Sequence, residues 1–339
     1  MAKQNLQESM DACETLLRAT VFRLPLPDDF ILSPETWRAT ASRAMEQGVG
    51  ALLYDAIPCL PRCNHPPRET LFALAAAANR AERGYWQKQR AYETFSLLVG
   101  KEYPMLKGLS LAALYPTPQH RVFGDIDLFT GEETETLTQL LESHGIACDK
   151  KNPRHTTFVY QGVLFEAHRW LDYWNPRKDP RQAASFPFAC ERRSFQALFL
   201  SEGLNYDALF FDKAITLRNM LDWALLTRQP DFDREEFNRM KKNTEVERFA
   251  DAFDSHCNTV LRLTPPSPMP TVACGNFSAM FCRQRKRRSS PLLRVLLRSG
   301  KYVRYGRCYK HLYGENMFRH FYWENLKAAT RSLARFLHS

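Results

Sequence analysis

The short apolar segment Gly124–Phe129 carries two carboxylates at alternate positions, and this feature most limits how the chain can fold. Alternate side chains of an extended strand share a face, so Asp125 and Asp127 point one way while Ile126 and Leu128 face the core. The carboxylates are separated by two residue rises of about 3.3 Å each. Such a pair could hold one or two hard divalent cations, which prefer oxygen ligands.

Long segments on both sides of this strand are predicted to be helical. Ser33–Pro34 is typical of a helix N-terminus, and a second helix is predicted over Arg68–Leu98. A strongly apolar helix is predicted over Ala208–Leu226, with Arg218 and Asp222 at the spacing of an intrahelical ion pair.

After that helix, a second Asp-x-Asp occurs at Asp231 and Asp233. It is expected to be the polar start of a helix, in which one of the two aspartates is the N-cap. Asp-x-Asp alone therefore does not define a site.

Strand signals are concentrated between the helical regions. Tyr103–Gly108 is predicted to be a short strand, and Thr130–Glu133 to be the capping box of a helix that Gly145 ends. Two further strands, Thr156–Tyr160 and Val163–Trp170, are predicted to form a hairpin through a Gln-Gly turn.

Two places near these strands carry candidate functional groups. Gly108 is expected to join a strand to a helix, where exposed N–H groups can bind phosphate, although a plain tight turn is the alternative. Lys107 and Ser110 could add a charge and a hydroxyl there. On the last strand Glu166 and His168 share one face. Glutamate has a low propensity for strands, so Glu166 is more informative than an average exposed acid.

The composition is that of a folded globular protein, with 44% hydrophobic and 12% aromatic residues in 339. No apolar run approaches the roughly 18 residues of a membrane span, and the first residues lack the apolar core of a signal peptide. The nine cysteines are odd in number and scattered, which does not indicate a disulfide framework. A reducing cytoplasm is the expected location.

The positive charge is concentrated at the C-terminal end. Residues 281–339 contain 15 Lys/Arg and two acids, a charge of +13, so the rest of the chain carries 10 − 13 = −3. Four tyrosines there follow a helical spacing among basic residues: Tyr302, Tyr305, Tyr309 and Tyr313. This pattern could contact nucleic acid or an anionic membrane, or the tyrosines could pack on the protein itself.

A glycine junction, an Asp-x-Asp strand and a lone acid on a later strand thus follow one another in order. This order resembles the nucleotidyltransferase superfamily with the polymerase-β-type core, and more closely the family of uncharacterised nucleotidyltransferases, especially its Bacteroides-type members. The resemblance covers roughly residues 98–225 and is carried by Leu106-Lys107-Gly108, Tyr115-Pro116-Thr117-Pro118, Arg121, Gly124-Asp125-Ile126-Asp127-Leu128, His155, Phe158, Gly162-Val163, Glu166-Ala167-His168-Arg169, Leu217-Arg218 and Asp222-Trp223.

The chain departs from the pattern in two places. Leu109 stands between the glycine and Ser110, and Phe210, Phe211 and Asp212 stand where family members often carry histidines. The second departure weakens any role of that helix toward an acceptor, but neither departure affects the three acids.

The resemblance implies an α+β fold, in which a small mixed nucleotidyltransferase-type sheet is embedded between N-terminal and C-terminal helical regions. The expected divisions are an N-terminal helical region (1–97), a nucleotidyltransferase core (98–175), a helical region (176–275) and a basic, aromatic-rich helical tail (276–339).

The implied activity is the transfer of an NMP group from an NTP, such as ATP, to a hydroxyl, with release of pyrophosphate. Asp125 and Asp127 would ligate Mg²⁺ (or Mn²⁺), and Glu166 would help to hold a second ion or take the proton of the hydroxyl. The nucleotide phosphates would be contacted by Lys107, Gly108, Ser110 and Arg121.

His155 and His168 are candidate contacts to substrate or metal, or hydrogen-bonded histidines beside the sheet. The acceptor is left open between a small molecule, a protein side chain and nucleic acid, and so is the oligomeric state. The alternative function is an inactive nucleotide- or nucleic-acid-binding module that uses the basic tail at residues 281–339.

Overall fold

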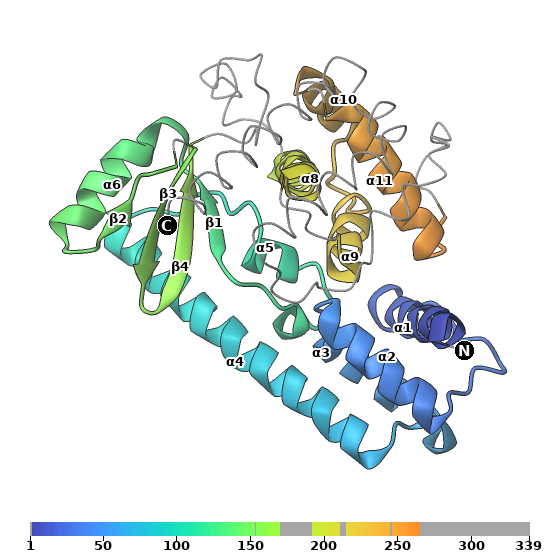
Figure 1. Cartoon of the computed structure of the whole chain (residues 1–339). Coiled ribbons are helices and arrows are strands. Elements are labelled where there is room, and N and C mark those ends of the chain that lie inside the picture. Colours follow the sequence, from blue (N-terminus) through green and yellow to red (C-terminus); the bar gives the residue numbers. More distant parts are fainter. Residues whose placement is uncertain (1, 153, 170–191, 211–214, 245, 265–339) are drawn as a thin grey trace, which may run out of the picture.

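The computed structural model describes residues 2–152, 154–169, 192–210, 215–244 and 246–264. The basic tail therefore lies outside the described residues, as does part of the predicted helix over Ala208–Leu226. The described fold is α+β, with a small mixed sheet among helices that precede and follow it in the chain (Figure 1). This arrangement confirms the predicted fold class, while the divisions at residues 97, 175 and 275 stay predictions.

The sheet has the strand order β1-β4-β3-β2. Its strands are β1 (Ile126–Phe129), β2 (Cys148–Asp149), β3 (His155–Tyr160) and β4 (Val163–His168). β1 pairs parallel with β4, whereas the β4–β3 and β3–β2 pairs are antiparallel. The β3–β4 hairpin turns at Gln161–Gly162, where both residues have positive φ, as the predicted two-residue turn requires.

One face of the sheet is apolar and is covered by α4 (Arg68–Val99), the long helix that runs along the lower edge of Figure 1. Phe95 of α4 packs on Phe158 and Phe165, with ring centroids 5.5 and 5.0 Å apart. α6 (Thr134–Ser143) adds buried leucines to the same cluster. The acids lie on the opposite face.

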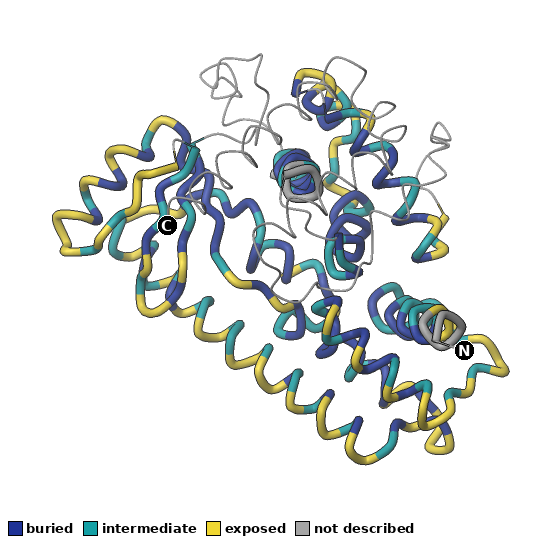
Figure 2. The backbone as a smooth tube through the Cα atoms, viewed as in Figure 1, coloured by how far each residue is buried: buried dark blue, intermediate teal, exposed yellow. Residues whose placement is uncertain are grey.

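The remaining helices form a second cluster. They are α1 (Ala2–Phe22), α2 (Pro34–Glu46), α3 (Gly50–Tyr54), α8 (Arg192–Phe210), α9 (Leu217–Leu226), α10 (Arg234–Asn243) and α11 (Glu247–Val260). Their buried side chains share one hydrophobic cluster, so helices from before and after the sheet form a common core (dark blue in Figure 2). The described residues also form short helices: η1 (Ile57–Cys59), η2 (Arg62–Asn64), α5 (Leu109–Ala112), η3 (Pro118–His120) and η4 (Gly131–Glu133).

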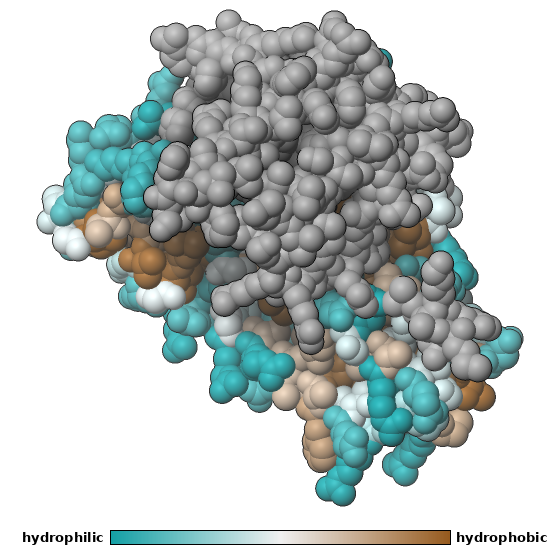
Figure 3. Space-filling model, in the orientation of Figure 1, coloured by the Kyte–Doolittle hydropathy of each residue, from teal (hydrophilic) through white to brown (hydrophobic). Residues whose placement is uncertain are grey.

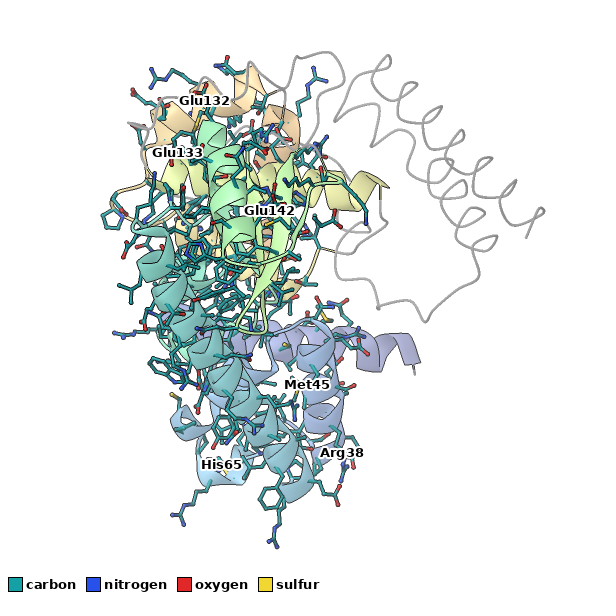
Figure 4. The ribbon with its side chains drawn as sticks, turned by 90° about the vertical axis from the view of Figure 1, so that its left-hand side faces the viewer. Arg38, Met45, His65, Glu132, Glu133 and Glu142 are labelled. Carbon is teal, nitrogen blue, oxygen red and sulfur yellow. The ribbon has the colours of Figure 1, made fainter. Side chains whose placement is uncertain are left out.

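The two ends of α4 lie in different parts of the molecule. In the side view, His65, just before α4, and Arg38 of α2 both lie toward the bottom, whereas Glu142 of α6 lies higher, at the level of the sheet (Figure 4). The visible surface over α6 is mainly hydrophilic (Figure 3), as expected for a helix whose other face is buried. In the described part of the chain, no helix combines the length and the apolar character needed to cross a membrane.

Two predicted elements before and after the sheet are wrong. Tyr103–Gly108 is not a strand, because it makes only one isolated bridge to β1, between Met105 and Leu128. The predicted helix over Ala208–Leu226 is interrupted at Thr216, whose backbone is extended just before α9 begins. Thr216 and Asn219 form a capping box that starts a new helix.

Several predicted caps can be compared with the structure. Ser33 caps α2, and Asp233 rather than Asp231 caps α10 by accepting a bond from the backbone of Glu236 (2.8 Å). The capping box at Thr130–Glu133 is wrong, because Thr130 precedes η4 (Gly131–Glu133) without a side-chain cap bond and α6 begins at Thr134. The Thr130 hydroxyl instead lies 2.7 Å from the Thr134 hydroxyl.

Candidate active site

Three carboxylates meet on the polar face of the sheet. Parallel pairing of β1 with β4 places Asp127 opposite Glu166, and Asp125 precedes β1 on the same face. One carboxylate oxygen from each of the three lies within 4.8 Å of the others. We refer to Asp125, Asp127 and Glu166, with the cations that contact them, Lys107 and His168, as the acid cluster.

Asp127 is the most deeply buried member, with none of its surface exposed. Its Oδ1 is hydrogen-bonded to His168 Nε2 and forms an ion pair with Lys107 Nζ, both at 3.1 Å. Its Oδ2 is buried and has no hydrogen-bond partner among the described residues. Leaving a carboxylate oxygen in that state is costly, and a divalent cation with oxygen ligands would satisfy it. The residues therefore fit Mg²⁺ or Mn²⁺.

His168 joins the two strands through their acids. Its Nε2 lies 3.1 Å from Asp127 Oδ1 and 3.3 Å from Glu166 Oε2, and only 1% of the residue is exposed. Burial by itself would lower the pKa of His168, but the hydrogen bonds to Asp127 and Glu166 outweigh it, so the pKa is raised. Burial also opposes ionisation of Glu166, yet the bond from His168 lowers the pKa of that carboxyl. His168 thus offsets the repulsion between the acids.

His155 lies beside His168 on the neighbouring strand. The two residues are register partners, and their ring centroids are 5.0 Å apart. Burial first, and then the charge of His168, lower the pKa of His155, which favours its neutral form. His155, Glu166 and His168 also offer ligand atoms within 4.8 Å of one another. A contact from either histidine to substrate stays a prediction.

The glycine junction brings Lys107 to the acids. Lys107 Nζ lies 3.1 Å from Asp127 Oδ1 and 4.0 Å from Asp125 Oδ1. Gly108 has a φ of +80° and ψ of −121°, and a Cβ there would lie 3.2 Å from the Asp125 carbonyl oxygen. The glycine is needed because the backbone approaches β1 closely in a conformation that other residues avoid.

Ser110 already has partners within the protein. Its hydroxyl donates to the Met105 carbonyl (3.1 Å) and accepts a bond from Gln196 Nε2 (2.8 Å). It therefore anchors α8 to the junction. Its predicted contact to phosphate stays a prediction, and it would require these bonds to rearrange.

Arg121 is buried and binds the backbone at Gly108. Its Nε and Nη2 donate to the two carboxylate oxygens of Asp222 at 2.6 and 2.8 Å, and its Nη1 donates to the Gly108 carbonyl (3.1 Å). The Tyr115 hydroxyl donates to Asp222 as well (2.7 Å). We refer to Tyr115, Arg121 and Asp222 as the Arg121 cluster. A direct contact from Arg121 to nucleotide stays a prediction, since the guanidinium faces Asp222 here.

The expected ion pair between Arg218 and Asp222 is wrong. Arg218 instead donates to the Val122 carbonyl (2.9 Å), while Asp222 is bound by Arg121 through a two-bond fork. The fork geometry of a guanidinium matches a carboxylate, which makes this buried pair the stronger one.

Two residues of α8 at the site had no sequence signal. Gln196 also donates to the Met105 carbonyl (2.8 Å). The Phe199 ring packs edge-on against His168, with centroids 4.7 Å apart, and lies 5.8 Å from Lys107 Nζ. Nothing in the local sequence of a helix shows which distant strand it will contact.

Comparisons with known proteins agree with this geometry. A family model described as uncharacterised nucleotidyltransferase matches residues 33–262, a span that includes the acid cluster and the Arg121 cluster. No curated protein and no solved structure gives a match. The match confirms the resemblance predicted from the sequence and extends it on both sides of residues 98–225. The chain belongs to the family of uncharacterised nucleotidyltransferases.

Proposed function

We propose that this protein is a metal-dependent nucleotidyltransferase that moves an NMP group from an NTP to a hydroxyl acceptor and releases pyrophosphate. Family membership supports the class of reaction. The observation that carries the metal dependence is the buried Oδ2 of Asp127, which has no partner among the described residues and lies beside two more carboxylates.

Asp125, Asp127 and Glu166 would hold Mg²⁺ or Mn²⁺ through their free oxygens. When bound, the cations would offset the negative charge that develops on the attacking and leaving oxygens. Asp127 can point its Oδ2 at a cation because His168 donates to its Oδ1. Such contacts from outside the ligand set orient a metal ligand and tune its basicity.

In the proposed reaction the hydroxyl oxygen of the acceptor forms a bond to the α-phosphorus of the NTP. The bond from that phosphorus to the oxygen that bridges to the β-phosphate breaks, and its electron pair leaves with pyrophosphate. The proton of the hydroxyl passes to Glu166 or, where Glu166 instead helps to hold the second cation, to solvent. The lowered pKa of Glu166 keeps the carboxylate ionised, as either role requires.

The test incubates the full chain with each labelled NTP and Mg²⁺ or Mn²⁺, and measures pyrophosphate release. We expect Asp127→Asn to lower turnover by about 10³-fold or more, because one ligand and its charge are lost. Asp28→Asn is the matched control: Asp28 is exposed in the loop between α1 and α2, helices that lie away from the sheet (Figure 1). Its turnover should equal that of the wild type.

The same assay distinguishes the proposed enzyme from the alternative function. An inactive binding module would bind nucleotide without metal and release no pyrophosphate, and Asp127→Asn would not change its binding. Equal turnover by wild type and Asp127→Asn would also contradict the proposal. A role of residues 281–339 with nucleic acid or an anionic membrane is a separate proposal, tested by deleting them and measuring salt-sensitive binding.

A further inference from the structure

The Lys107 ammonium already contacts two of the carboxylates that would receive a metal ion. It contacts Asp127 Oδ1 at 3.1 Å and Asp125 Oδ1 at 4.0 Å, so it lies against both carboxylates of the Asp-x-Asp strand. The face of the Phe199 ring is 5.8 Å from the same nitrogen. Carboxylates and a ring face are both favourable surroundings for a positive charge.

The backbone of Lys107 is fixed, but its ammonium is not enclosed. The following Gly108 is held through its carbonyl by Arg121, and the Ser110 hydroxyl lies 3.3 Å from the Lys107 carbonyl oxygen. About a third of the side chain is exposed (30%). A four-carbon stem on a fixed backbone allows the charge to move without moving the junction.

A divalent cation bound by Asp125 and Asp127 would lie about 2.1 Å from their oxygens. The ammonium at its present distance would then lie directly beside an ion of like charge, at the same carboxylates. His168 also contacts Asp127, but it is buried on all sides and offers no such movement. Lys107 is therefore the cation of the cluster that can give up its place.

We propose that the Lys107 ammonium competes with the metal for the carboxylates of Asp125 and Asp127, and that its displacement couples metal binding to nucleotide binding. This inference rests on the proposed function. Without metal and nucleotide, the ammonium neutralises Asp125 and Asp127. When metal and nucleotide arrive together, the ammonium leaves the carboxylates and binds the NTP phosphates, for which a lysine acts as a point charge. Metal alone binds weakly because it must displace the lysine without that compensation.

The first measurement is the affinity of the full chain for Mn²⁺ alone, by electron paramagnetic resonance of free Mn²⁺. We expect Lys107→Met to bind Mn²⁺ about tenfold more tightly than the wild type, because the competing charge is gone. Lys107→Arg should stay near the wild type. Lys242→Met is the matched control, since Lys242 is exposed on α10 and pairs with Glu247 (3.9 Å), outside the cluster.

The second measurement is the affinity for a non-hydrolysable NTP analogue at saturating Mn²⁺. Lys107→Met should bind it about tenfold more weakly, whereas Lys107→Arg should retain most of the affinity. If Lys107→Met is poorly folded, the rise in melting temperature on adding Mn²⁺ to the folded fraction provides the same comparison. That rise should be larger in Lys107→Met than in the wild type.

Unchanged or weaker Mn²⁺ binding by Lys107→Met would show that Lys107 does not compete with the metal. Unchanged binding of the analogue would show that the Lys107 ammonium does not move to the NTP phosphates. Asp127→Asn distinguishes these failures from that of the proposed function. If Asp127→Asn abolishes Mn²⁺ binding while Lys107→Met has no effect, only the competition is wrong. If Asp127→Asn has no effect either, the metal site and the competition are both wrong.

Discussion

The acid cluster and the Arg121 cluster are both buried groups of charges, and they lie on either side of Gly108. In the Arg121 cluster both oxygens of Asp222 are bound, by Arg121 and Tyr115, and the guanidinium also holds the Gly108 carbonyl. In the acid cluster Asp127 has one oxygen bound twice and the other bound by no described residue.

This difference in hydrogen bonding distinguishes a carboxylate with a structural role from one with a functional role. A buried carboxylate with both oxygens hydrogen-bonded can stabilise the fold, provided that neither partner is removed. A buried carboxylate with an unengaged oxygen costs free energy in the unliganded protein and is satisfied when a ligand binds. Charge alone does not distinguish the two clusters, whereas their hydrogen bonds do.

The largest effect on stability is expected at the Arg121 cluster. Asp222→Asn leaves Arg121 buried without its charge partner, so we expect the free energy of unfolding to fall by about 3–5 kcal/mol. Urea unfolding measures it. Asp233→Asn is the control, because Asp233 is the N-cap of α10 and asparagine caps equally well. A loss below about 1 kcal/mol in Asp222→Asn would contradict the structural role of this cluster.

An intermediate effect is expected where the two clusters meet. Gly108→Ala places a Cβ against the Asp125 carbonyl at a positive φ, so we expect it to cost about 1–3 kcal/mol and to weaken Mn²⁺ binding. Gly145→Ala is a close control: Gly145 also has a positive φ (+75°), but a Cβ there would meet no atom within 4 Å. It should cost about 1 kcal/mol without changing Mn²⁺ affinity. Equal Mn²⁺ affinities in the two variants would show that the close approach at Gly108 does not position the acids.

The smallest effect is a pH dependence at a third charged contact, where His120 lies between Asp55 (2.6 Å) and Glu82 (3.0 Å). Burial alone would lower the pKa of His120, but the bonds to both carboxylates outweigh it and raise the pKa. Its contribution, about 1 kcal/mol, should be present below the unfolded pKa of about 6.5 and lost as pH rises through the folded pKa.

Urea unfolding across this pH range tests the contribution of His120. The difference in stability between wild type and His120→Gln should be largest at low pH and should shrink as pH rises. A difference that is constant with pH would show that the ring is bound only in its neutral form.

Local sequence determined those features that depend on near neighbours in the chain. Alternation placed Asp125 with Asp127 and Glu166 with His168 on shared strand faces, and the Gln161–Gly162 turn fixed the β3–β4 hairpin. The same local reasoning failed over Ala208–Leu226, because an apolar run does not reveal a capping box such as that at Thr216 inside it.

Tertiary structure decided which charges meet. The parallel pairing of β1 with β4 brought Asp127 to Glu166 and His168, and it left Oδ2 of Asp127 without a partner among the described residues. Asp222 pairs with Arg121, 101 residues away in the chain, instead of with Arg218, one helical turn away. The physical reason is that the strength of a hydrogen bond or an ion pair depends on distance and burial in the folded protein, and separation along the chain determines neither.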